Sequence, residues 1–447
     1  MRARTARTGL VAALLGASAL AASALAASSP AFAARTAGPS QARIGTGIHP
    51  RLNLSVLPGP ARVALAPAGK SRNLFGVFCN SASDCWAVGE IRTATTTVNQ
   101  ILHWTGKKWF PVKVPNQAGT AKDDENELFA VRCTSLKNCW AVGDSQQPGS
   151  VAQLDQAMHY DGKSWALASM PAPGGTSGGA FNTLEDLACT SAKNCWAVGE
   201  YGLIGTSMQP QVGFNQVLHF DGRQWMFMKT PNPGGINGGH INALDSVRCT
   251  TPTSCWAVGT DGSILNGPNL RNEILFSNGK KWTTVNAPDP ASIGKLHVNI
   301  LNFLACTAKP DCWAVGVAGN LNGKKQFEHN EALHWTGKTW VVVKTPNPDK
   351  TSDELFGIAC VAAQDCWAVG SVGGDPSKNE AMHWNGAKWS LVPTVNGAGR
   401  GKDIRNNLAS VRCTSHSNCW AVGYSQSGGK ADTNQIEHWN GTKWSGS

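Results

Sequence analysis

Six acidic side chains are the best candidates for chemistry in this sequence. Three of them directly follow the glycine of a recurring Cys-Trp-Ala-Val-Gly phrase, and the other three lie shortly before the first cysteine of a repeat. Carboxylates grouped around one opening could hold a cation, bind polyol hydroxyls or form an acid–base pair for glycoside chemistry. Ordinary solvated loop acids are the alternative explanation. The candidate ligand-binding residues are Glu90, Asp144, Glu200, Glu185, Asp186 and Asp245.

Two other patterns match functional motifs but lack their structural context. The stretch Gly175–Gly179 fits a nucleophile elbow, yet no strand-to-helix turn surrounds it. His329, Glu331 and His334 could be metal ligands, but alternation along a strand points His334 away from the other two. The cysteine pairs lack the second ligand pair that structural zinc requires. The sequence therefore predicts no metal and no cofactor, and it leaves the catalytic residues unassigned.

Seven copies of one repeat of about 55 residues must position the acids. Each copy contains Cys-x5-Cys-Trp-Ala-Val-Gly, and six copies contain a later His-x-x-Gly, which is Phe276–Gly279 in repeat four. Every repeat divides into four short segments rich in β-branched and aromatic residues, separated by turn residues. Four strands per repeat are typical of a propeller blade. The sequence predicts an all-β fold, a seven-bladed β-propeller with four antiparallel strands per blade.

Fourteen cysteines fall into seven equally spaced pairs, each across the predicted turn between strands one and two. An even, regular set of cysteines is typical of an oxidising compartment. Each short loop, once closed by a bridge, is worth about 2 kcal/mol in the loop-entropy model. One intra-blade disulfide per blade is expected. The pairs are Cys79–Cys85, Cys133–Cys139, Cys189–Cys195, Cys249–Cys255, Cys306–Cys312, Cys360–Cys366 and Cys413–Cys419.

Tryptophan and histidine recur at fixed places in the repeats, and a structural role is expected for both. Sheets stacked around an axis need bulky, flat side chains between them, although tryptophan could also stack on sugars. Six histidines at one repeat position indicate a repeated hydrogen bond rather than six active sites. These histidines are His103, His159, His219, His334, His383 and His438.

Loop lengths indicate where a functional face would lie. The spacing varies mainly between strands two and three of the repeats, while the hairpin turns keep their length. In an up-and-down blade, the variable loops and the connections between blades share one face. Loops on a rigid scaffold commonly carry function. If strand one is innermost, the candidate acids gather around one sector of the axial opening on this face.

The first 33 residues are predicted to be a signal peptide. Three arginines precede an Ala/Leu-rich run from Gly9 to Ala27, and Ala31–Ala33 provides a small-x-small cleavage site. The predicted localisation is secreted and extracellular. An uncleaved membrane anchor is the alternative, and no transmembrane segment is expected after signal cleavage.

Residues 34–71 are expected to form an N-terminal segment, and residues 72–447 the propeller. The chain stops at Ser447, which leaves the fourth strand of the last repeat unfinished. The segment Leu52–Pro58 is expected to complete the last blade, because closure removes an exposed sheet edge. A disordered linker is the alternative.

These repeats resemble the Cys-Trp-Ala-Val-Gly propellers of exported bacterial proteins, and they are distantly similar to kelch and Asp-box propellers. The likeness covers residues 72–447. Asp-box turns also lie between strands three and four, but here the step from Asp161 to Trp165 is one residue shorter, and His159 replaces the usual Ser or Thr. The resemblance implies the fold and transfers no activity.

The leading hypothesis is a secreted, non-catalytic recognition propeller that binds glycan or an extracellular protein through its loop-rich face, as a monomer. The repeats are closely alike and no irregular catalytic constellation stands out. The alternative is an extracellular carbohydrate-active hydrolase or lyase that uses the acids around the axial opening, and an envelope scaffold is a third possibility. The formal charge of +10 comes without a basic run, so no nucleic-acid partner is expected.

Overall fold

The computed structural model of the chain describes most residues from Gly69 onward. Within this part every regular element is a β-strand, and no helix is long and apolar enough to span a membrane. The predicted signal peptide and the predicted closing segment Leu52–Pro58 lie outside the described residues, so both stay predictions. The described ranges are 69–148, 152–205, 211–265, 267–291, 296–307, 311–322, 326–399, 401 and 403–447.

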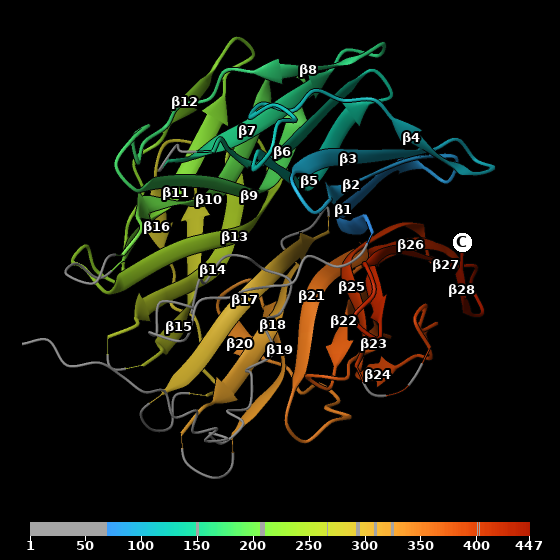
Figure 1. The fold of residues 1–447 in the computed structure, drawn as a ribbon. Coiled ribbons are helices and arrows are strands. Elements are labelled where there is room, and N and C mark those ends of the chain that lie inside the picture. The colour runs from blue at the N-terminus through green and yellow to red at the C-terminus, as the bar shows by residue number, and fades with distance from the viewer. Residues whose placement is uncertain are drawn as a thin grey trace, which may run out of the picture. The chain divides into compact units, whose positions relative to one another are not determined.

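The strands come in seven sets of four, one set per repeat (Figure 1). The first strands are β1 (Ser71–Ser81), β5 (Glu125–Ser135), β9 (Ala180–Ser191), β13 (His240–Thr251), β17 (His297–Cys306), β21 (Asp353–Ala362) and β25 (Ile404–Ser415). The second strands are β2 (Asp84–Arg92), β6 (Asn138–Gln146), β10 (Asn194–Leu203), β14 (Ser254–Ser263), β18 (Cys312–Asn320), β22 (Asp365–Val372) and β26 (Asn418–Ser427). The third strands are β3 (Thr97–Trp104), β7 (Gln153–Tyr160), β11 (Val212–Phe220), β15 (Asn269–Ser277), β19 (Phe327–Trp335), β23 (Lys378–Trp384) and β27 (Thr433–Trp439). The fourth strands are β4 (Trp109–Val112), β8 (Trp165–Ala168), β12 (Trp225–Phe227), β16 (Trp282–Thr284), β20 (Trp340–Val342), β24 (Trp389–Leu391) and β28 (Trp444–Gly446).

Each set forms an antiparallel sheet in chain order, which confirms the four-stranded repeat. Five sets are separate sheets, whereas repeats four and five join into one eight-stranded sheet through a single parallel pairing of Asn269 with His297. The expectation of an unfinished last repeat was wrong, because β28 pairs with β27 and is as long as most other fourth strands. Three residues suffice for a strand that pairs on one edge only.

A bulge bends each first strand near its middle, and the recurring glycine accommodates it. In β1 the pairing shifts between Leu74 and Gly76, and the other first strands shift at the same place. A Cβ added to Gly89 would lie 1.9 Å from the carbonyl oxygen of Asn73. The glycine of the Cys-Trp-Ala-Val-Gly phrase therefore serves a close backbone approach that no other residue permits.

Tryptophans hold neighbouring sheets together, as predicted. The second-strand tryptophan of each repeat meets the fourth-strand tryptophan of the next repeat edge to face, for example Trp86 with Trp165 at 5.4 Å between ring centroids. The last repeat makes the same contact with the first, through Trp420 and Trp109. A buried apolar cluster that includes Leu74 and Val422 lies between these two sheets. Such edge-to-face geometry is the arrangement that aromatic rings prefer.

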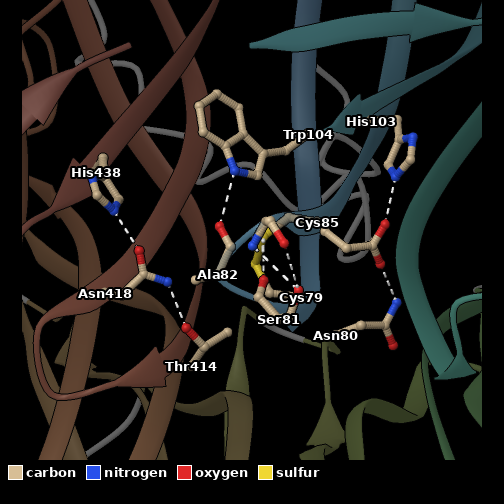
Figure 2. The surroundings of a disulfide bond; sticks show 12 residues. Cys79, Asn80, Ser81, Ala82, Cys85, His103, Trp104, Thr414, Asn418 and His438 are labelled. Carbon is tan, nitrogen blue, oxygen red and sulfur yellow. Dashed lines mark hydrogen bonds and ion pairs between the residues drawn. A yellow bond between two sulfur atoms is a disulfide. The ribbon is translucent and has the colours of Figure 1, made fainter. Parts of the chain in front are cut away.

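The seven predicted disulfides are all present, and each joins strands one and two of its own repeat. Figure 2 shows the turn around Cys79–Cys85. In this turn, Nε2 of His103 lies 2.6 Å from Oδ1 of Asp84. The last repeat repeats this contact with His438 and Asn418 (Figure 2). Repeat four has Phe276 in place of the histidine and Ser254 in place of its partner. The repeat histidines are therefore structural, as expected.

Candidate carboxylate site

The candidate site lies where strands one and two of the first two repeats reach the face of the longer loops. Pairing register places Asn73 opposite Glu90 in repeat one and Glu127 opposite Asp144 in repeat two. Strand β5 also packs against β1 and β2, so the two pairs belong to adjacent sheets. We call Glu90, Arg92, Glu127 and Asp144 the carboxylate site.

An arginine bridges the two repeats in this site. Nη2 of Arg92 donates to Oε2 of Glu90 at 3.1 Å and to Oε1 of Glu127 at 3.0 Å. Glu90 also accepts a hydrogen bond from Nδ2 of Asn73 at 2.8 Å and is only 2% exposed. The Arg92 side chain remains 53% exposed and that of Glu127 13% exposed. The site thus presents a cation to the solvent, with the largely buried carboxyl group of Glu127 beside it.

Electrostatics favour a protonated Glu127. Burial raises the pKa of Glu127 well above its usual value, and the charges of Glu90 and Asp144 raise it further. A hydrogen bond with Glu90 acts in the same direction, while Arg92 acts against it. A carboxyl group whose pKa is raised in this way can keep its proton and act as a general acid.

Repeat seven borders the site on its other side. Oδ1 of Asp432 accepts a hydrogen bond from Gln426 at 2.9 Å, and the Asp432 amide donates to Oγ of Ser71 at 3.1 Å. Burial raises the pKa of Asp432, with a further contribution from the charge of Glu90. Burial, and then the charge of Asp432, raise the pKa of Tyr424 to about 12. Tyr424 therefore keeps its phenolic proton at neutral pH and can donate a hydrogen bond.

The six predicted acids do not form one group. Glu90 and Asp144 lie in the carboxylate site, where Oδ2 of Asp144 accepts a bond from Gln153 at 2.6 Å. Glu200 is a buried residue of the third repeat, at the level of Glu90 in its own sheet. Glu185 is the bulge residue of β9.

Asp245 and Asp186 lie elsewhere. Asp245 is the bulge residue of β13, and its charge contributes to raising the pKa of Glu354 to about 8, after burial and Glu328. Asp186 is fully buried and accepts bonds from Arg132 and Arg248, at 3.0 and 2.5 Å. The predicted grouping of Asp186 with the other acids is therefore corrected.

Sequence reasoning missed Glu127 and Arg92. Both had a signal: Arg92 lies two residues after Glu90, on the same face of the strand, and Glu127 stands at the first-strand position paired with Asp144. Within the described ranges, no group of three or more His, Cys, Asp or Glu residues is arranged to hold a metal ion.

Comparisons with known proteins find similar folds among solved structures. No protein-family model and no curated protein matches the chain. Among solved structures, a polysaccharide lyase of family PL25, an ulvan lyase, is similar with a TM-score of 0.50 and 9% identity, over 85% of this chain and 96% of that chain. An ulvan lyase of this family bound to -[GlcA(1-4)Rha3S]- is similar with a TM-score of 0.51 and 10% identity, over the same shares of both chains.

These neighbours overturn the prediction of a non-catalytic recognition module. That prediction rested on the regularity of the repeats, yet structures named as polysaccharide lyases share this fold over most of their length. A regular scaffold is therefore no argument against catalysis. At this level of identity the likeness concerns the fold, and the chemistry must come from the residues of this chain.

Proposed function

We propose that the chain is an extracellular carbohydrate-active enzyme, a lyase of uronic-acid-containing polysaccharides, acting at the carboxylate site. The observation that carries the proposal is the pairing of a half-exposed Arg92 with a Glu127 whose pKa is raised. The cation can bind and neutralise a uronate carboxylate, while the protonated carboxyl group can donate to a leaving oxygen. The names of the fold neighbours support this class of substrate.

The proposed step is a β-elimination that conserves the proton count of the site. Glu90 acts as the base and removes the proton at C5 of the uronate, the C4–O4 bond breaks, and a C4–C5 double bond forms. Glu127 gives its proton to the departing O4, and the C5 proton returns to the pair of carboxyl groups through Glu90. Arg92 offsets the negative charge that builds up on the uronate carboxylate. The pair ends the cycle with the same single proton.

The test is an assay of the purified protein on a panel of uronic-acid polysaccharides, following the ultraviolet absorbance of the unsaturated product. Glu127→Gln is expected to lower turnover about 10²- to 10⁴-fold, because an amide cannot donate a proton to O4 as an acid does. The matched control is Glu331→Gln, which changes another buried acid with a raised pKa, far along the chain. Reducing ends without unsaturated product would indicate hydrolysis, and unchanged turnover in Glu127→Gln would refute the site.

The finer architecture belongs to the same proposal. We propose that the seven sheets ring one axis as a closed seven-bladed propeller. The contact of Trp420 with Trp109 and a hydrogen bond from the Arg72 amide to the Asp432 carbonyl at 2.9 Å support closure between the last and first repeats. Export through residues 1–33 fits seven disulfides, which persist in oxidising compartments.

A further inference from the structure

Three arginines meet at the opposite end of the first strands, where the disulfide-bridged turns lie. Each directly precedes the first cysteine of its repeat, a position that holds phenylalanine or alanine in the other four repeats. Together they line a pocket with Phe303, Ile358 and Val411. The arginines are Arg132, Arg248 and Arg412.

Two phenyl rings bring the guanidinium groups together. The Arg248 guanidinium lies 4.6 Å from the ring centroid of Phe303, and that of Arg412 lies 4.7 Å from Phe78. Arg132 lies between them, at 5.8 Å from Phe78 and 5.9 Å from Phe303. The three cations therefore form one compact group rather than three separate surface charges.

Positive charge exceeds negative charge in this pocket. Asp186 accepts hydrogen bonds from Arg132 and Arg248, but the buried Nε of Arg412 has no hydrogen-bond partner. Burial, and then the charge of Arg248, lower the pKa of Arg412 to about 10, and no carboxylate acts against them. The residues that line the pocket include no aspartate or glutamate.

We propose that this pocket binds one tetrahedral dianion, sulfate or hydrogen phosphate. Three guanidinium groups against one carboxylate leave two positive charges, which a dianion neutralises and a halide or carboxylate would not. Guanidinium groups present planar forks of N–H donors that suit oxyanions. Uncompensated buried charge is costly, so an ion that completes the group stabilises the fold. The Arg132 and Arg248 side chains are only 10% and 16% exposed, which favours the inorganic ion over a polymer.

This site is independent of the proposed enzyme function. Glu127 and Arg132 are five residues apart on the same strand, which separates the carboxylate site and the arginine pocket by roughly 15 Å. Loss of one should leave the other in place.

Thermal unfolding at constant ionic strength tests the proposal. Replacing chloride with low millimolar sulfate or phosphate should raise the Tm of the full chain by about 4 °C and saturate, because a ligand that binds only the folded state stabilises it. Arg412→Gln should abolish the saturable shift, while Arg223→Gln, in an exposed hairpin turn, should keep it. Calorimetric titration with sodium sulfate should give one site.

Sulfate also stabilises proteins non-specifically, in proportion to its concentration. A shift that never saturates and is equal in Arg412→Gln and the unaltered chain would overturn the proposal. Competition with a sulfated monosaccharide identifies the source of the anion. Failure to displace inorganic sulfate supports the free ion, and displacement would contradict it in favour of a sulfate ester. An unsulfated sugar is the control.

Discussion

The two ends of the first strands carry opposite charges on the same backbone. At the face of the longer loops, acids and one arginine form the carboxylate site, with Glu127 partly open to solvent. At the turn end, three arginines meet, and the carboxylate of Asp186 pairs with two of them, Arg132 and Arg248. Bulge, register and tryptophan packing are alike in every repeat, so they cannot cause this difference. The difference in charge arises from positions at which the repeats carry different residues.

The comparison separates two kinds of residue in a repeat protein. Cysteine, glycine and the second-strand tryptophan are the same in all seven repeats, and each solves a packing or backbone problem that recurs seven times. The positions of Glu90 and Arg132 hold different residues in different repeats. In such a scaffold, the candidate functional residues lie at positions where the residue type differs between repeats.

Removing the charge of Asp186 would have the largest effect on stability. Asp186→Asn leaves buried guanidinium groups without their anion, and this should cost about 3–5 kcal/mol in the free energy of unfolding. Asp375→Asn is the matched control, because Asp375 pairs with Arg405 at an exposed position. Denaturant unfolding measures both. Equal losses in the two variants would contradict the contrast between a buried group and a surface pair.

Removing one disulfide should have the next largest effect. Replacing both Cys306 and Cys312 with serine should lower the free energy of unfolding by about 2 kcal/mol, because the bridge closes a short loop. Cys306 also lines the arginine pocket, so the saturable sulfate shift should weaken in this variant. The same pair of changes at Cys79 and Cys85, which do not line the pocket, should lower stability equally and spare the shift.

A buried acid far from both ends of the first strands should make the free energy of unfolding depend on pH. Burial raises the pKa of Glu331 well above its usual value, and Glu331 accepts a hydrogen bond from Asn272. Such a group contributes fully to the free energy of unfolding below pH 4.5, and this contribution is lost as the pH rises through the folded-state pKa. Glu331→Gln, which copies the glutamine of other repeats, should therefore gain about 1–2 kcal/mol at pH 8 and nothing at pH 4. Unfolding curves at both pH values measure this, and activity should persist, unlike in Glu127→Gln.

The smallest effect concerns the histidine pair that repeat four lacks. His438→Phe alone leaves Asn418 without its ring partner and should cost about 1 kcal/mol, and adding Asn418→Ser should recover much of it, since repeat four uses phenylalanine and serine there. A double-mutant cycle measures the coupling. Additive losses would show that the pair is not a unit.

The fold was largely predictable from the sequence because its determinants are local and repeated. Each cysteine has its partner six residues away, and each Gly between strands three and four permits a positive φ, as at Gly106 with 86°. The length of the last fourth strand was misjudged, because three residues carry too weak a pattern to be recognised. The predicted N-terminal strand lies outside the described residues and stays a prediction.

The sites were harder to predict because they depend on contacts between repeats. Glu90 and Asp144 could be found by their place after the glycine. The placement of Glu185 and Asp186 depends on a bulge at Glu185 that interrupts strand alternation and on the arginines that bind Asp186, and no residue type marks either. The arginine pocket joins residues more than a hundred positions apart, and they meet only when the sheets pack in sequence order.

The short span of each disulfide has a consequence for the history of the molecule. Since both sulfur atoms of a bridge come from one repeat, copying or deleting one repeat in the gene always adds or removes a complete bridge and leaves no orphan thiol. Covalent bonding therefore sets no limit on the number of repeats. The limit is set by how many sheets fit together side by side.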